Sequence, residues 1–381
     1  LARFSGLVSS MISNYRNNDI ASLLRQGWKN YIIEDSAGGR TNMLVALPSN
    51  TNLLEKRPLV VFVGGFSADL EMSAFNAIAV PLHRFYGWNV ALVESVTSAS
   101  WINKNKKLII SGREAGRDLY LKLAALRHHP EIGPWISEMA LVGLSLGGSD
   151  CAFASLFTED YPELGVVIDG PVISISSPAD RLGSLGDIRQ KGGPAGLAIK
   201  RMFSSAYFGA KGVFDSYVDR DFCWLCKGAS IDQLLEELFL QAERSTASST
   251  VPHNGSDIPS EYSSLENYKT LFDLNKYINK IKIPLLWINS IDDPIVDYSL
   301  TFPVVKRLSK NPLVGLMTLK EGGHVGYAYS YGQGQIDRWI IETVVAWGKR
   351  PEAEYYKWRR IGHSRVNRFT GTESIDLLPV E

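Results

Sequence analysis

Short, uninterrupted runs of apolar residues recur along the chain, separated by longer stretches in which apolar residues return every three or four positions. An apolar run of four to six residues is typical of a strand buried on both faces, and the longer spacing is typical of an amphipathic helix. Strands and helices in alternation predict an α/β protein with a mostly parallel sheet between layers of helices. The predicted strands of this sheet are 59–63, 90–93, 139–142, 164–169, 284–288 and 315–319.

The N-terminal part of the chain shows a different pattern. Residues 28–34 and 41–47 are strand-like and flank the turn-forming residues 35–39, so a strand–turn–strand opening is expected. Farther along, Ser111 and Glu114 form a capping box in front of apolar residues at helical spacing. Further helices are predicted at 74–85, 302–308 and 336–347.

The alternation of strands and helices is interrupted once, which suggests how the chain is divided. Residues 1–170 and 270–349 would form the α/β core, including an N-terminal extension. Residues 171–269 are polar with helical spacing and include a stretch rich in Ser, Thr, Pro and Gly at 244–264. We expect this segment to be an inserted cap or lid, and 350–381 to be a C-terminal tail.

Composition and charge exclude several functions. The 381 residues include 40 basic and 40 acidic side chains, which cancel to a formal charge of +0. A neutral balance provides no electrostatic footprint for nucleic acid, so no nucleic-acid partner is expected. No apolar run approaches the roughly 18–20 residues that a membrane-spanning helix needs, so no transmembrane segment is expected.

The three cysteines are too few for a disulfide framework. Cys151 follows a run of small residues and is expected to be a helix-packing residue. Cys223 and Cys226 have the spacing of a redox pair or half a zinc site, without a second pair nearby. Two thiols on one helical turn, or a local disulfide in an exported protein, are the interpretations favoured for them. The compartment stays open between cytoplasm, which the lack of a leader pattern favours, and export after removal of a leader.

A Gly-x-Ser-x-Gly motif follows one predicted strand directly. Strand 139–142 continues into Gly143, Ser145 and Gly147, and small residues at 148–152 come next. A serine hydroxyl becomes a nucleophile when a sharp strand-to-helix turn holds it out of the fold beside a base. Glycines on either side let such a turn tighten, because they lack Cβ.

Two further chemical groups follow predicted strands in the same way. Asp292 and Asp293 come after strand 284–288, and His324 comes after strand 315–319. The carboxyl ends of parallel strands meet at one edge of a sheet, where ligands bind. The serine, an acid and the imidazole are therefore expected to converge there.

These residues resemble the α/β-hydrolase superfamily, in its serine esterase and lipase branch. The resemblance covers roughly 60–347, and the order Ser145, Asp293, His324 is the order found in that superfamily. It implies that Ser145 attacks a carbonyl carbon, His324 carries the proton, and an aspartate orients the imidazole.

The identity of the acid stays open among three residues. Asp293 is favoured, because an acid followed by Pro-Ile-Val is the usual arrangement of the superfamily after this strand. Asp292 is its immediate neighbour. Asp169 is the third candidate, because some members place the acid one strand earlier.

The resemblance also implies an oxyanion hole made of backbone N–H groups. Leu146, which follows the serine, and Phe66, which follows Gly64-Gly65 after an earlier strand, are the expected donors. Many relatives carry His-Gly where this chain has Gly-Gly, and Ser67 is an alternative donor nearby.

Together these features predict a serine hydrolase that cleaves carboxylic esters through an acyl-enzyme intermediate. A small-molecule or lipid-like ester is the expected substrate, and no metal or organic cofactor is implied. An acyltransferase or thioesterase with the same triad, or a non-catalytic binding protein on the same fold, are the alternatives. Acyl chain length, leaving group and oligomeric state cannot be predicted from the sequence.

Overall fold

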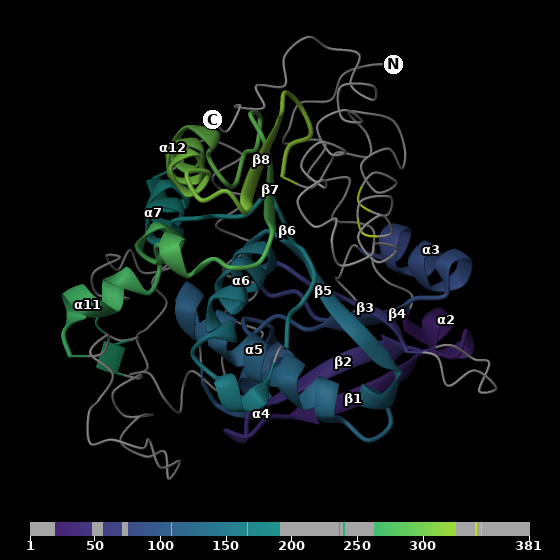
Figure 1. Cartoon of the computed structure of the whole chain (residues 1–381). Coiled ribbons are helices and arrows are strands. Elements are labelled where there is room, and N and C mark those ends of the chain that lie inside the picture. The colour runs from purple at the N-terminus through teal and green to yellow at the C-terminus, as the bar shows by residue number, and fades with distance from the viewer. Residues whose placement is uncertain are drawn as a thin grey trace.

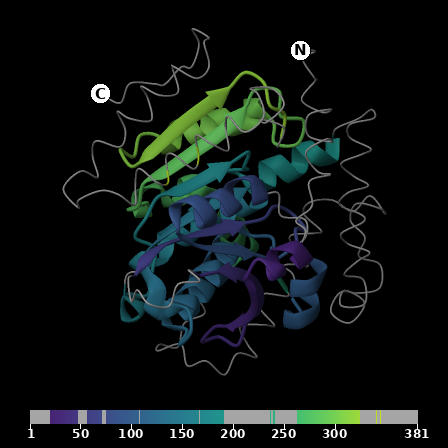
Figure 2. The same cartoon turned by 90° about the vertical axis from the view of Figure 1, so that its right-hand side faces the viewer.

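The computed structural model describes residues 20–47, 56–70, 75–107, 109–165, 167–190 and 263–324, together with positions 236, 239, 240, 340 and 344. These residues form one eight-stranded sheet with the strand order β1-β2-β4-β3-β5-β6-β7-β8 (Figures 1 and 2). The strands are β1 (Lys29–Glu34), β2 (Arg40–Ala46), β3 (Arg57–Val63), β4 (Asn89–Val93), β5 (Ile136–Leu144), β6 (Val172–Ile175), β7 (Leu285–Ser290) and β8 (Val314–Leu319).

The sheet is parallel except at one edge. β1 and β2 form an antiparallel hairpin, β2 pairs antiparallel with β4, and every pair from β4 to β8 is parallel. In the hairpin turn, the side chain of Asp35 accepts hydrogen bonds from the backbone N–H groups of Ala37 and Gly39. The predicted strand–turn–strand opening and the mostly parallel α/β sheet are therefore confirmed.

Helices cover both faces of the sheet (Figure 1). The α-helices are α2 (Ile20–Arg25), α3 (Asn76–Tyr86), α4 (Ala99–Asn105), α5 (Gly112–His128), α6 (Leu146–Ala154), α7 (Arg181–Gln190), α11 (Leu265–Thr270) and α12 (Tyr298–Leu308). Short 3₁₀ turns are η1 (Gly133–Trp135), η2 (Ser155–Thr158), η3 (Pro162–Leu164) and η5 (Leu274–Lys280).

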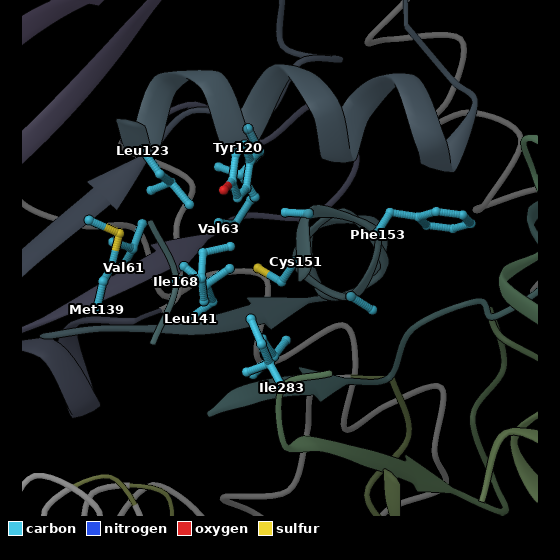
Figure 3. Packing of buried hydrophobic residues seen from close by; sticks show 14 of the residues in the cluster. Val61, Val63, Tyr120, Leu123, Met139, Leu141, Cys151, Phe153, Ile168 and Ile283 are labelled. Carbon is cyan, nitrogen blue, oxygen red and sulfur yellow. The ribbon is translucent and has the colours of Figure 1, made fainter. Parts of the chain in front are cut away.

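The apolar runs in the central strands supply two cores at once. In β3, Val61 and Val63 pack with side chains of α5 and α6, whereas Val60 and Phe62 pack with α2 and α3 on the other face. Figure 3 shows the first core, in which Cys151 of α6 lies among side chains of the sheet. A strand with apolar residues at every position is required here, because successive side chains point to opposite, equally buried faces.

Helix α5 begins where the capping box predicts. The Ser111 hydroxyl accepts a hydrogen bond from the Glu114 N–H at 3.3 Å and also contacts the Glu114 carboxylate. The buried side chains of this helix include Ala115 and Leu119. The cap and the apolar stripe therefore set the start and the orientation of the helix.

The strand that follows the serine motif lies later in the chain than predicted. Residues 162–164 form the 3₁₀ turn η3, and the paired strand is β6 at Val172–Ile175. Val167 and Ile168 are fully buried in the core, which explains their strand-like apolarity. Burial of a short apolar run does not by itself require pairing in a sheet.

The first positions of the predicted cap segment 171–269 belong to the sheet, because β6 spans Val172–Ile175. Most other positions of the segment, including Cys223 and Cys226, lie outside the described residues, as do the tail 350–381 and most of the predicted helix 336–347. The division into core, cap and tail stays a prediction. Within the described ranges, no helix is both long enough and apolar enough to cross a membrane.

Candidate active site

Ser145 occupies a strained turn between β5 and α6. β5 ends at Leu144, α6 begins at Leu146, and Ser145 between them has φ 56° and ψ −128°. A positive φ is uncommon for a residue with a side chain and persists only where the surroundings enforce it. The Ser145 N–H donates to the Ile175 carbonyl of β6 at 2.7 Å, and the Ser145 carbonyl accepts from Gly148 N–H at 3.1 Å.

The flanking glycines are required by close contacts between backbones. A Cβ on Gly143 would lie 2.3 Å from the Gly147 carbonyl oxygen, and a Cβ on Gly147 would lie 2.2 Å from the Gly64 carbonyl oxygen. Real Cβ atoms do not approach backbone atoms so closely, so neither position has room for a side chain. The end of β5, the start of α6 and the loop after β3 can therefore meet around Ser145.

Ser145, His324 and Asp293 lie in one chain of hydrogen bonds. His324 Nε2 lies 2.8 Å from Ser145 Oγ, and His324 Nδ1 lies 2.9 Å from Asp293 Oδ2 and 3.1 Å from Oδ1. The three residues follow β5, β8 and β7, so they lie at the carboxyl edge of the sheet. The side chain of Asp293 is completely buried, and that of His324 is 8% exposed.

The backbone fixes the orientation of the Asp293 carboxylate. Its Oδ1 accepts hydrogen bonds from the N–H groups of Ile295 at 2.8 Å and Val296 at 2.9 Å. Hydrogen bonds to a buried carboxylate compensate for the loss of water around it. The other oxygen of this carboxylate lies nearest to His324.

Asp292 contacts the loop that carries His324. Its Oδ1 accepts from Gly323 N–H at 2.8 Å, while Ser290 Oγ donates to the Gly323 carbonyl at 2.5 Å. Gly323 has φ 58°, a conformation that glycine adopts without strain. Asp292 therefore supports the loop instead of pairing with the imidazole.

Asp169 lies away from this edge of the sheet. Its carboxylate accepts from Met139 N–H at 2.5 Å and from the Arg127 guanidinium at 2.9 Å. Met139 precedes Leu144 by five residues, which is about 16 Å along a strand. Burial raises the pKa of Asp169, and the Met139 and Arg127 contacts oppose this shift. Of the three candidate acids, Asp293 is the one whose carboxylate lies within hydrogen-bonding distance of His324 in the described residues.

The loop after β3 passes directly over Ser145. A Cβ on Gly65 would lie 2.9 Å from Ser145 Cβ, and Ser67, with φ 56°, donates its N–H to Thr97 Oγ1 at 2.9 Å. Because the Ser67 N–H donates to Thr97, it does not supply the alternative oxyanion-hole donor that the sequence suggested. Leu146 is the first residue of α6, where the N–H groups have no acceptor within the helix. Phe66 and Leu146 belong to the two segments that meet at the serine.

The sequence did not single out Thr97 or its neighbour Ser95. The two hydroxyls are buried and lie 2.9 Å apart, and Ser95 N–H donates to the Ala68 carbonyl at 2.8 Å. They tie the loop after β3 to the end of β4. Hydroxyl residues at positions 95 and 97, shortly after the predicted strand 90–93, are the signal that could have identified them. Among the described residues, no three His, Cys, Asp or Glu side chains gather as a metal site would require.

Comparison with known proteins finds solved structures of similar fold and one short segment of similar sequence. No protein-family model matches the chain. A segment of 67 residues is 40% identical to monoacylglycerol lipase ABHD2 of Danio rerio, covering 17% of this chain and 15% of that protein. The acylaminoacyl peptidase of Pyrococcus horikoshii superposes with a TM-score of 0.52 at 15% identity, over 90% of this chain and 46% of the peptidase.

A 2,6-dihydroxy-pseudo-oxynicotine hydrolase superposes with a TM-score of 0.50 at 14% identity, over 86% of this chain and 70% of that protein. The match to the acylaminoacyl peptidase covers 46% of that protein, so this chain spans less than half of its length. At these identities the structural matches concern the fold.

Proposed function

Because this chain has the α/β-hydrolase fold, we propose that it is a serine hydrolase that cleaves carboxylic esters through an acyl-enzyme intermediate. The observation that carries the proposal is the hydrogen-bond chain from Ser145 Oγ through His324 to the buried Asp293. A serine aligned with an imidazole, which is in turn held by a carboxylate, is the arrangement that acyl transfer requires.

In the first half of the reaction, Ser145 Oγ attacks the ester carbonyl carbon while His324 Nε2 takes the hydroxyl proton. With Nδ1–H directed at Asp293, Nε2 is the nitrogen that accepts the proton of Ser145. The carbonyl oxygen becomes an oxyanion, which would accept hydrogen bonds from the N–H groups of Leu146 and Phe66. Collapse of this intermediate breaks the bond to the alcohol, which leaves with the proton from His324.

In the second half, water takes the place of the alcohol. His324 accepts a proton from the water as the oxygen attacks the acyl carbon, and it returns that proton to Ser145 when the acid departs. The reaction is complete without any group beyond the side chains and backbone donors of the chain. If another nucleophile replaced water, the same acyl-enzyme would make the protein an acyltransferase. If the substrate were a thioester and water still released the acid, the protein would be a thioesterase.

The substrate class is inferred from the short segment of higher similarity. Because 67 residues are 40% identical to a monoacylglycerol lipase, a lipid-like acyl ester is favoured over a peptide. The pocket that would select the acyl chain is assigned to the predicted cap, most of which lies outside the described residues.

Removal of the Ser145 hydroxyl oxygen tests the proposed mechanism. Ser145→Ala should abolish hydrolysis of p-nitrophenyl esters of graded chain length and labelling by a fluorophosphonate, while the melting temperature is retained. Ser309→Ala removes a similar hydroxyl at the end of α12, where it donates only to the Lys306 carbonyl at 2.8 Å, and should leave both unchanged. Turnover or labelling that survives in Ser145→Ala would refute the mechanism, and a wild-type protein that is never labelled would favour a binding protein.

A further inference from the structure

A buried arginine lies against the first turns of helix α6. Arg181 is the first residue of α7 and is 1% exposed. Its guanidinium pairs with the Asp150 carboxylate, and its Nε donates to Ser149 Oγ at 2.9 Å. Its Nη1 donates to the Ile110 carbonyl at 2.8 Å, and Nη2, which pairs with Asp150, also contacts the Leu146 carbonyl at 3.4 Å.

These contacts surround the turn that carries Ser145. The Ser145 carbonyl accepts hydrogen bonds from the N–H groups of Gly148 and Ser149, and Arg181 holds the side chain of Ser149. On the opposite side, the Ser145 N–H is held by the Ile175 carbonyl, six residues before Arg181 in the same segment. Residues 175–181 thus hold the serine turn both through the backbone and through the guanidinium.

The pair is costly to bury, so its presence calls for an explanation. The Asp150 side chain is 3% exposed, and burial raises its pKa, which the Arg181 guanidinium opposes. Removing two charges from water often costs more than their mutual attraction returns, and apolar residues of similar size are frequently at least as stable. What a multidentate guanidinium supplies instead is a fixed geometry.

Ser145 needs such a fixed geometry, because its positive φ is stable only where neighbours enforce it. We infer that Arg181 is a positioning residue that, together with Asp150, holds the first turns of α6 so that Ser145 Oγ stays aligned with His324. The inference rests on the proposed function in so far as Ser145 is the nucleophile. It deepens that function by adding a residue whose own side chain does not touch the reacting atoms.

The decisive variant removes both charges together. In Arg181→Met combined with Asp150→Leu, apolar side chains of similar size replace both charges, so the melting temperature should lie above that of either single variant, although Ser149 Oγ and the Ile110 carbonyl still lose a donor. Each single substitution leaves a buried charge without its opposite charge and should lower the melting temperature further. The double variant should nevertheless lose about 10²-fold in kcat and in the rate of fluorophosphonate labelling, with KM unchanged, since a misplacement of about 1 Å costs that much. A stable double variant with wild-type kcat would overturn the inference.

A second buried ion pair provides a matched control. Lys122 pairs with Asp35 where α5 meets the β1–β2 turn, and the two side chains are 1% and 2% exposed. Lys122→Met combined with Asp35→Leu removes the same kinds of charge at a site on the hairpin side of the sheet. It should change the melting temperature and leave kcat per folded molecule unchanged. An equal loss of kcat in this control would also overturn the assignment.

A readout that needs no substrate separates this inference from the proposed function. Amide hydrogen exchange at Gly148 and Ser149, which donate to the Ser145 carbonyl, should be faster in the Arg181→Met, Asp150→Leu double variant than in the wild type. Wild-type exchange at these two amides would overturn the positioning role. A wild-type protein that hydrolyses no ester would refute the proposed function, while the exchange rates would still decide the role of Arg181.

Discussion

Replacement of Asp293 by asparagine changes one atom and should nearly abolish turnover. Oδ1 of Asp293 is fixed as an acceptor by the N–H groups of Ile295 and Val296. In Asp293→Asn, the amide oxygen must keep that place, because an NH₂ group there would face two donors. The amide nitrogen then occupies the position of Oδ2, which lies 2.9 Å from His324 Nδ1.

The consequence is the wrong tautomer of the imidazole. An NH₂ group facing Nδ1 requires that nitrogen to accept, so the ring proton moves to Nε2, which lies 2.8 Å from Ser145 Oγ. A protonated Nε2 cannot take the serine proton. The equivalent change in another serine hydrolase lowers kcat about 10⁴-fold. That factor corresponds to about 5.5 kcal/mol in the activation free energy, and we expect a loss of this order.

The assay compares two neighbouring substitutions. Asp292→Asn keeps an oxygen that can accept from Gly323 N–H, so its kcat for a p-nitrophenyl ester should fall by less than about tenfold, the equivalent of 1.4 kcal/mol. Fluorophosphonate labelling should follow the same order. If Asp292→Asn lost more activity than Asp293→Asn, the assignment of the acid and the tautomer argument would both be wrong.

Two further substitutions test how the site is held. Thr97→Val removes the acceptor of the half-buried Ser67 N–H and the partner of the buried Ser95 hydroxyl, which should cost about 1–3 kcal/mol of unfolding free energy in urea unfolding. It should also lower kcat in ester kinetics by displacing Phe66, and an unchanged kcat would contradict the role of the loop. Gly147→Ala places a Cβ 2.2 Å from the Gly64 carbonyl oxygen, so it should lower the unfolding free energy by about 1–3 kcal/mol or more. Gly315→Ala is the control, because the nearest atom there is the flexible tip of Leu286 at 3.3 Å. Thermal unfolding compares the two variants, and equal losses would refute the steric argument.

The central strands could be predicted because burial alone decides their residue pattern. The strand 59–63 lies within β3 and 139–142 within β5, because full burial on both faces leaves an unbroken apolar run. β6 was misplaced for the same physical reason. Val167 and Ile168 are as buried as strand residues, yet the ladder with β5 begins only at Val172.

The groups that support the site gave no comparable signal. Arg181 lies in a polar stretch that the sequence assigns to the cap, where a charged residue is expected to be exposed. Its partner Asp150 lies 31 positions earlier and is equally buried, so only the tertiary structure pairs them. The two acids 292 and 293 are chemically identical. The backbone turn after Asp293 decides which of them faces the imidazole, and before the structure only the resemblance, through Pro-Ile-Val after the acid, favoured Asp293.

Backbone strain points to the same edge of the sheet by an independent route. Within the described ranges, four residues other than glycine have a positive φ, and three of them are Ser67, Ser145 and Ser176. They follow β3, β5 and β6, which are neighbours in the sheet, so the three strained positions lie side by side at its carboxyl edge. Strain of this kind costs about 1–3 kcal/mol per residue and clusters where function requires a fixed geometry. A serine that served only as a turn residue would not need two strained neighbours on adjacent strands, whereas a nucleophile held between an imidazole and a backbone loop would.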